Sequence, residues 1–203
     1  MTMQDEFEQL YRYLLLHPED FVWRKKVKPK LNTQQGKDEV WEKYLSVRNS
    51  QLSVSTPSTV PDEAVSVVIM ASFGYTPEQA QYIKLTHAQS MACENMVGEL
   101  LERYLDTILK RYGWIRCWGD MVNKIDFIKP SAQGNYRKLQ IKNRNNSENS
   151  SSSSVRNGTD IEKWFRSFSR GGTNWDAFPE VTARQQLSET GFQEFINRTL
   201  SQN

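Results

Sequence analysis

Asp126 and the triplet Gln140-Ile141-Lys142 are the residues whose types and spacing can do chemistry. Each stands in a short segment that alternates polar and apolar residues, which is the pattern of a β-strand. Because residues two apart share a face of a strand, Gln140 and Lys142 point the same way and Ile141 points into the core. When the two segments pair as antiparallel strands, three polar side chains come close together.

This grouping predicts a Mg²⁺ site. A carboxylate and a second oxygen ligand can hold Mg²⁺, which prefers oxygen and usually keeps several waters. A bound ion polarises a phosphoryl oxygen and lowers the pKa of a water that attacks in line, while the Lys142 ammonium orients that water or stabilises developing negative charge. The chemistry that we expect is hydrolysis of phosphodiester bonds.

Gln140 leaves this site one carboxylate short, because a neutral amide oxygen binds Mg²⁺ more weakly than a carboxylate. The broad apolar stripe of residues 86–111 predicts a central helix behind the site. Glu94 falls on or beside the stripe and Glu99 on the polar face, so we expect Glu94 to be the missing acid and keep Glu99 as the alternative. A carboxylate at the core margin, satisfied by a cation, explains Glu94 equally well. The predicted catalytic residues are Asp126, Gln140, Lys142 and Glu94, and the predicted metal set is Asp126, Gln140, Ile141 and Glu94.

Periodicity predicts the elements that position these residues. The predicted helices cover residues 6–16, 38–47 and 62–73, a short helix starting at Thr76-Pro77, the central helix 86–111, a helix near 160–168, and a last amphipathic helix carrying Phe192 and Phe195. The predicted strands cover residues 114–118, 125–128 and 136–142, the last two joined by a turn through Gly134. Gly171-Gly172 predicts another turn.

The length of 203 residues, 37% of them hydrophobic, fits one compact domain. We expect residues 1–203 to form a single nuclease domain, with a mainly helical part in residues 1–75, and the catalytic core and DNA-reading segment in residues 86–170.

The start of the chain lacks a secretory pattern and no stretch is apolar enough to span a membrane, so we expect a soluble, cytoplasmic protein without a membrane partner. Cys93 and Cys117 show neither metal-ligand nor disulfide spacing and are expected to be buried thiols.

The arrangement of Asp126 and Gln140-Ile141-Lys142 resembles the PD-(D/E)XK nucleases, over residues 86–156. The signature of that superfamily is an Asp at the end of one strand and an acidic-x-Lys triplet on the next. Two positions depart from it: Ile125 stands where Pro is common, and Gln140 replaces the acid of the triplet. These departures bear on the number of metal ions and on the role of Gln140.

The segments around this signature narrow the resemblance to type II restriction endonucleases, and among them to the SinI-type group. The segments are His87-Ala88-Gln89-Ser90-Met91-Ala92-Cys93-Glu94-Asn95, Gly98-Glu99-Leu100-Leu101-Glu102, Gly113-Trp114 and Lys142-Asn143-Arg144-Asn145-Asn146-Ser147-Glu148-Asn149-Ser150-Ser151. The resemblance implies a homodimer that cuts both strands of double-stranded DNA at a short palindrome, with GG-(A or T)-CC as the site of the SinI-type group.

The Asn- and Ser-rich segment that follows Lys142 has the composition of a flexible linker, yet it leaves the strand that carries the metal site. Arg can contact guanine through two hydrogen bonds, and Asn and Ser side chains can bond base edges. We therefore expect it to read DNA. The predicted DNA-binding residues are Arg144, Asn145, Asn146, Ser147, Asn149, Ser151, Arg156 and Asn157.

The net charge of the whole chain does not indicate DNA binding, but the charge of the region around this segment does. The 26 basic and 24 acidic residues leave a net charge of +2, too small to indicate a nucleic-acid partner. Residues 134–172 instead hold eight Lys or Arg against three acidic residues. A second basic run, residues 24–30, is expected to be a solvated loop, with a phosphate contact as the alternative.

The fold that we expect is α/β, with a restriction-endonuclease-like core in which helices flank a central mixed β-sheet. The expected function is that of a Mg²⁺-dependent type II restriction endonuclease. Two alternatives stay open: a repair or structure-specific nuclease with the same core, and a DNA-binding module whose metal site has decayed at Gln140.

Overall fold

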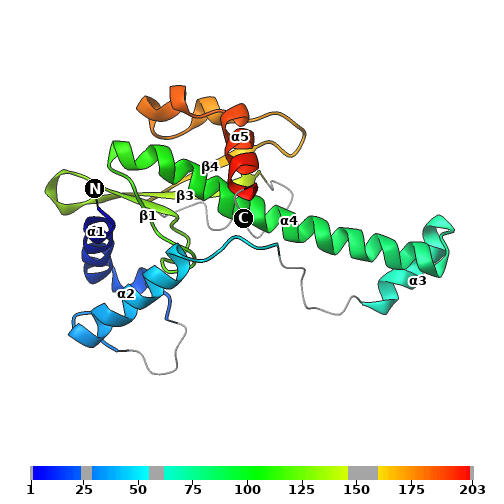
Figure 1. Ribbon diagram of the computed structural model, residues 1–203, viewed down its shortest axis with the longest axis horizontal. Coiled ribbons are helices and arrows are strands. Elements are labelled where there is room, and N and C mark those ends of the chain that lie inside the picture. The colour runs from blue at the N-terminus through cyan, green and yellow to red at the C-terminus, as the bar shows by residue number, and fades with distance from the viewer. Residues whose placement is uncertain (1, 24–28, 55–61, 146–159, 202–203) are drawn as a thin grey trace. The chain divides into compact units, whose positions relative to one another are not determined.

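The computed structural model describes residues 2–23, 29–54, 62–145 and 160–201 (Figure 1). It divides into two compact units, one formed by Met1–Ser50 and Leu101–Asn203 and the other by Gln51–Leu100. The helices are α1 (Met3–Leu16), α2 (Gln34–Arg48), α3 (Glu63–Phe73), α4 (Pro77–Leu109) and α5 (Glu189–Leu200), and the strands are β1 (Ile115–Arg116), β2 (Phe127–Pro130), β3 (Tyr136–Arg144) and β4 (Ile161–Ser167). Short 3₁₀ turns cover Pro18–Asp20, Lys110–Tyr112, Ala132–Gly134, Trp175–Ala177 and Val181–Gln186.

The first unit is built on a mixed four-stranded sheet with the order β1-β2-β3-β4. β1 and β2 are antiparallel, as are β2 and β3, whereas β3 and β4 are parallel. The turn between β2 and β3 passes through Gly134, whose positive φ of 77° suits glycine. This sheet, with its helices, confirms the α/β fold and the predicted hairpin.

β4 corrects the prediction of a helix near residues 160–168. Apolar residues at 161, 164, 165 and 168 have the spacing of one helical face, but the segment pairs with β3 over its whole length. Two tertiary contacts favour the strand: Trp164 is buried, and Glu162 pairs with Arg137 of β3 at 2.8 Å. Pairing with an available strand edge therefore outweighs the local helical pattern.

One core of the first unit joins α1 and α2 to β1 and β2. Phe7, Leu10 and Leu14 of α1 are buried in the same apolar cluster as Ile115 and Ile128 of the sheet. The 3.6-residue periodicity of α1 and the alternation of the strands bring these side chains together, as their patterns predicted.

A second, aromatic core joins the end of α4 and α5 to β4. The ring of Trp164 on β4 packs 5.1 Å from Trp175 and 4.9 Å from Phe178, between ring centroids. Tyr104 of α4 contacts both Trp175 and Phe192 of α5. The predicted last amphipathic helix is confirmed, since Phe192 is buried and lies on its inner face.

The second unit is a helical hairpin made of α3 and the first part of α4. α3 ends at Gly74, in a left-handed conformation, and α4 begins at Pro77 behind Thr76, whose hydroxyl accepts a hydrogen bond from the Gln79 amide at 3.3 Å. The predicted short helix and central helix are one continuous helix, because its 33 residues contain no breaker between these segments. Within the described residues, no helix has the length and apolarity needed to cross a membrane.

Candidate active site

Asp126 lies directly before β2, at the point where the regular pairing of β2 with β3 ends. Its backbone amide donates to the Leu139 carbonyl at 2.9 Å, and its backbone carbonyl accepts from Cys117 at 2.8 Å. The side chain of Asp126 is also bonded to β3, because carboxylate Oδ2 accepts a hydrogen bond from the backbone amide of Ile141 at 2.5 Å. The carboxylate is thus held across the strand that carries the triplet.

Gln140 and Lys142 lie on either side of Ile141 on β3. Ile141 is buried, Gln140 is half-buried and Lys142 is exposed, which is the alternation predicted for this strand. The positive charge of Lys142 acts on the Asp126 carboxylate and lowers its pKa. The structure therefore brings Asp126 together with the triplet.

The electrostatic balance at Asp126 is dominated by burial. Burial raises the pKa of Asp126 above its ordinary value, against the hydrogen bond from Ile141 and the charges of Lys142 and Arg116, which lower it. The partners that surround the carboxylate thus do not fully offset the cost of ionising it. A positive ion bound beside it would do so.

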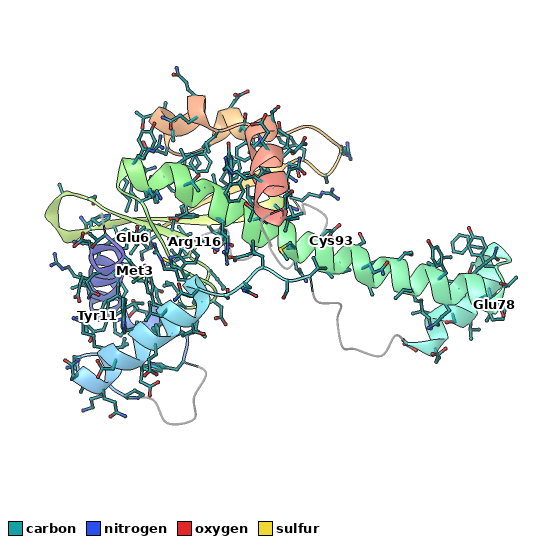
Figure 2. The ribbon with its side chains drawn as sticks, viewed as in Figure 1. Met3, Glu6, Tyr11, Glu78, Cys93 and Arg116 are labelled. Atoms are coloured by element: carbon teal, nitrogen blue, oxygen red, sulfur yellow. The ribbon has the colours of Figure 1, made fainter. Side chains whose placement is uncertain are left out.

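Arg116 is a component of this site that the sequence analysis missed. It pairs across β1 and β2 with Phe127, the neighbour of Asp126, and is almost completely buried (Figure 2). Its guanidinium binds Glu102 of α4 at 2.9 Å and stacks over the Trp118 ring at 4.2 Å. An arginine within the apolar segment 114–118 was the available signal, since a buried charge needs an acidic partner.

The burial of Glu94 and Glu99, the two candidates on α4 for the additional metal-binding carboxylate, differs from the expectation. Glu94 is exposed, whereas Glu99 is half-buried, so the expectation that Glu94 lies at the core margin is wrong. Both belong to the second unit, so a role for either in the metal set stays a prediction.

Cys93 is also exposed, contrary to expectation, while Cys117 is buried and burial raises its pKa. Among the described residues, Glu94 and Cys93 both lie on a stretch of α4 that is exposed, although the apolar stripe of the helix runs through it.

The predicted DNA-reading segment begins at the edge of the described structure. Arg144 ends β3 and is exposed, and the Asn145 amide donates to the Ser167 carbonyl of β4 at 2.9 Å. The other predicted DNA-binding residues lie outside the described residues: Asn146, Ser147, Asn149, Ser151, Arg156 and Asn157. The structure thus fixes where the segment leaves the sheet, two residues beyond Lys142.

Part of the local basic charge is used within the protein. Arg137 pairs with Glu162, Lys138 with Asp160 at 3.1 Å, and Arg166 with Glu189 of α5. The charge count of residues 134–172 therefore overstates the charge available to a DNA phosphate. Lys142 and Arg144 are exposed at the end of β3, where a phosphate can reach them.

The oxygen donors at Asp126 suit a hard divalent cation. Oδ2 of Asp126 is engaged by Ile141, which leaves its other oxygen to an ion, and the Gln140 amide and the Ile141 carbonyl are further oxygen donors. Elsewhere in the described part of the chain, His17, Glu19 and Asp20 place potential ligand atoms within 4.8 Å of one another. None of these three belongs to the predicted set, and Asp20 already accepts a hydrogen bond from the Tyr13 hydroxyl.

Asp126→Asn is expected to stabilise the metal-free protein at neutral pH, by on the order of 1 kcal/mol. Because the pKa of Asp126 is raised in the folded chain, ionising it there costs free energy that the unfolded chain does not incur. The gain should be absent at pH values below the unfolded-state pKa, where both states are protonated, should grow as the pH rises from the unfolded-state pKa to the folded-state pKa, and should be constant above it. Urea unfolding across this pH range measures it.

Asp176→Asn is the matched control, since Asp176 is exposed on the same unit. It should change stability little at any pH. A loss of stability in Asp126→Asn at neutral pH would contradict the proposed cost of the buried charge.

Comparison with known proteins identifies the family of the chain. The chain is 43% identical over 204 residues to the type II restriction enzyme Eco47I of Escherichia coli, a match that covers 98% of this chain and 87% of that enzyme. It is 47% identical over 146 residues to the type II restriction enzyme SinI of Salmonella infantis, which covers 71% of this chain and 64% of that enzyme. The model of the SinI restriction endonuclease family matches residues 1–202, so the chain belongs to this family.

Proposed function

We propose that the protein is a Mg²⁺-dependent type II restriction endonuclease that cuts both strands of double-stranded DNA at a short palindrome. Membership of the SinI restriction endonuclease family already makes it a sequence-specific DNA-cutting hydrolase. The metal, the palindrome and the residues in each role are the proposal. The observation that carries it is the Asp126 carboxylate held by the Ile141 amide, beside Gln140 and Lys142.

In the proposed mechanism, Asp126, Gln140 and the backbone carbonyl of Ile141 hold the ion. When bound, Mg²⁺ supplies a polarised phosphoryl group and an activated water. Lys142 lies one residue beyond the amide that fixes Asp126, so its ammonium can orient the attacking water or stabilise the negative charge that develops on the phosphate. Glu94, or Glu99, would add the second carboxylate that Gln140 cannot provide.

The proposed partner is double-stranded DNA, and the proposed assembly is a homodimer that acts in the cytoplasm. A palindrome presents the same half-site twice, related by a two-fold axis, and two identical subunits meet it most simply. Arg144 and Asn145 begin the segment that would read the base edges, with Asn146, Ser147, Asn149, Ser151, Arg156 and Asn157 following along the chain.

The decisive experiment is digestion of mixed-sequence duplex DNA with Mg²⁺, followed by mapping of the cut ends. We expect one fixed palindrome at the ends. Asp126→Ala and Lys142→Ala should each slow cutting by at least about a hundredfold while leaving DNA binding in Ca²⁺ or without metal nearly unchanged. Lys110→Ala, which removes an exposed lysine elsewhere on the same unit, should cut normally.

Each alternative gives a different outcome in this assay. Ends that depend on junctions or scatter over many sequences would support a structure-specific nuclease. Selective binding without cutting would support a DNA-binding module that has lost its metal site at Gln140. Full activity in Asp126→Ala or Lys142→Ala would refute the assignment of the site.

Gln140→Glu tests whether the site is short of negative charge. A second carboxylate should lower the Mg²⁺ concentration for half-maximal cutting by roughly tenfold, because it is a stronger ligand than an amide. Gln140→Ala, the matched control, should raise that concentration. If neither variant shifts the metal requirement, Gln140 is not a ligand.

Arg144→Ala tests base recognition at the end of β3. The loss of a contact that makes two hydrogen bonds to guanine should reduce the binding free energy by about 1–3 kcal/mol at one base position. Discrimination at the other positions of the site should stay unchanged. Competition binding against single-substitution duplexes measures this. An equal loss on all sequences would instead assign Arg144 to a phosphate.

A further inference from the structure

β4 places Lys163 beside the triplet of the proposed active site. In the parallel pairing of β3 with β4, Gln140 lies opposite Lys163 and Lys142 lies opposite Phe165 (Figure 1). Paired residues of neighbouring strands are about 4.8 Å apart and point to the same face of the sheet. Lys163 therefore shares a face with Gln140 and Lys142. A helix over residues 160–168, as predicted from the sequence, would not group these three residues in this way.

The face that carries these three residues is covered at one end and open at the other. At the start of β3, Tyr136 packs against Tyr13 of α1, with 5.0 Å between the ring centroids. Tyr136 and Gln140 are four residues apart on the strand and point to the same side. The exposed residues that follow on this face are Lys142, Arg144 and Lys163. Lys163 thus lies on the open part of the face, where a substrate of the proposed site has to approach.

Acidic and basic residues that neighbour one another on β3 and β4 form ion pairs, as Arg137 of β3 does with Glu162 of β4 at 2.8 Å. Beside Lys163, the neutral amide of Gln140 stands where an acid would pair with the lysine. Among the residues that β3 and β4 present on the open part of the face, three are cations and none is an acid: Gln140, Lys142, Arg144, Lys163, Phe165 and Ser167. This part of the sheet suits an anion that comes from outside the chain.

A DNA phosphate is the anion that the proposed function brings to this face. Hydrolysis adds negative charge to the phosphate in the transition state, and fixed groups that neutralise this charge speed the reaction. A second metal ion does so in some nucleases, but it needs further anionic ligands. Gln140 is neutral and does not provide one, whereas an ammonium group needs none. The four-carbon stem of a lysine that starts beside Gln140 reaches a phosphate held there.

We propose that Lys163 is a second active-site lysine, which binds a non-bridging oxygen of the phosphate at the cut and neutralises its charge where a second metal ion would otherwise be needed. This deepens the proposed function and rests on it for the identity of the anion. The two lysines then have different tasks. Lys142 follows the Ile141 amide that holds Asp126 and acts on the attacking water or the developing charge, whereas Lys163 holds the phosphate from the moment that DNA binds.

Binding of a mixed-sequence DNA duplex, measured by fluorescence anisotropy in EDTA, tests the phosphate contact without metal. Lys163→Ala should weaken binding by roughly three- to tenfold and lower the slope of log affinity against log salt by about one. Lys163→Arg should bind almost normally, because it keeps the charge. Lys110→Ala, the matched control, removes an exposed lysine elsewhere on the same unit and should bind as the unmodified protein does. Circular dichroism and thermal unfolding establish that each variant is folded.

Single-turnover cutting over a series of Mg²⁺ concentrations separates a phosphate contact from damage to the sheet. Lys163→Ala should lower the maximal rate by about tenfold to a hundredfold, and Lys163→Arg should recover most of this loss. The Mg²⁺ concentration for half-maximal cutting should not rise in Lys163→Ala, because the substitution removes a cation that repels the ion. Damage to the sheet around Gln140 would instead lower the rate and raise the Mg²⁺ requirement together.

Gln140→Glu tests whether positions 140 and 163 act on one another. The introduced carboxylate should pair with Lys163, as Glu162 pairs with Arg137, and so withdraw its charge from the phosphate. Adding Lys163→Ala to Gln140→Glu should then change the maximal rate by less than about threefold, although the same substitution alone costs tenfold or more. An undiminished effect in the double variant would contradict the proposed relation between the two positions.

Unchanged binding and cutting in Lys163→Ala would overturn the proposal, and this is the outcome expected if the lysine only protects β4, the outer strand of the described sheet, from pairing with other chains. A raised Mg²⁺ requirement would overturn it as well. Either result would leave the proposed function intact as long as the unmodified protein cuts at a fixed palindrome. If the unmodified protein does not cut, weaker metal-free binding by Lys163→Ala would still support the phosphate contact, so the two failures are distinguishable.

Discussion

The hydrogen bond from the Ile141 amide to the Asp126 carboxylate is the constraint on which the site depends. It joins the residue before β2 to the middle of β3, and it takes the place of a backbone-to-backbone contact at the end of regular pairing. The orientation of Asp126 is therefore set by the sheet itself rather than by a mobile side chain. Lys142 follows Ile141 on the same strand, so its backbone lies one residue beyond the amide that holds Asp126.

The negative charge of the Asp126 carboxylate is not fully compensated by other groups of the folded chain. The carboxylate is held with a raised pKa although Lys142 and Arg116 lie nearby, and Arg116 is in turn bound by Glu102 of α4. If the site holds Mg²⁺ as proposed, the stability that it gives up in the metal-free state is offset when the cation binds. Glu102 also links the end of α4 to β1, which couples the helical layer to the strand beside Asp126.

The sequence predicted the parts of the fold whose signals are local. The helical faces, the Gly134 turn and the strand alternation around Asp126 and the triplet follow from periodicity, and the structure has them. β4 could not be found this way, because its apolar residues have helical spacing and its partner, β3, is distant in the sequence. The role of Arg116 and the exposure of Glu94 were equally hidden, since burial is set by what the rest of the chain places around a residue. The assignment of Asp126, Gln140, Lys142 and Glu94 to catalysis remains a prediction.

The parallel pairing of β3 and β4 has a consequence for how such an enzyme can change over time. A chain that leaves β3 at Asn145 must enter β4 at Ile161, beside Lys138, so it returns along roughly 20 Å of strand. Residues 146–159 are enough chain to cover that span with length to spare. Insertions, deletions and replacements in this connection can accumulate without breaking the sheet. If this connection reads DNA as proposed, changes within it can alter the target preference while the proposed catalytic residues on β3 and before β2 stay in register.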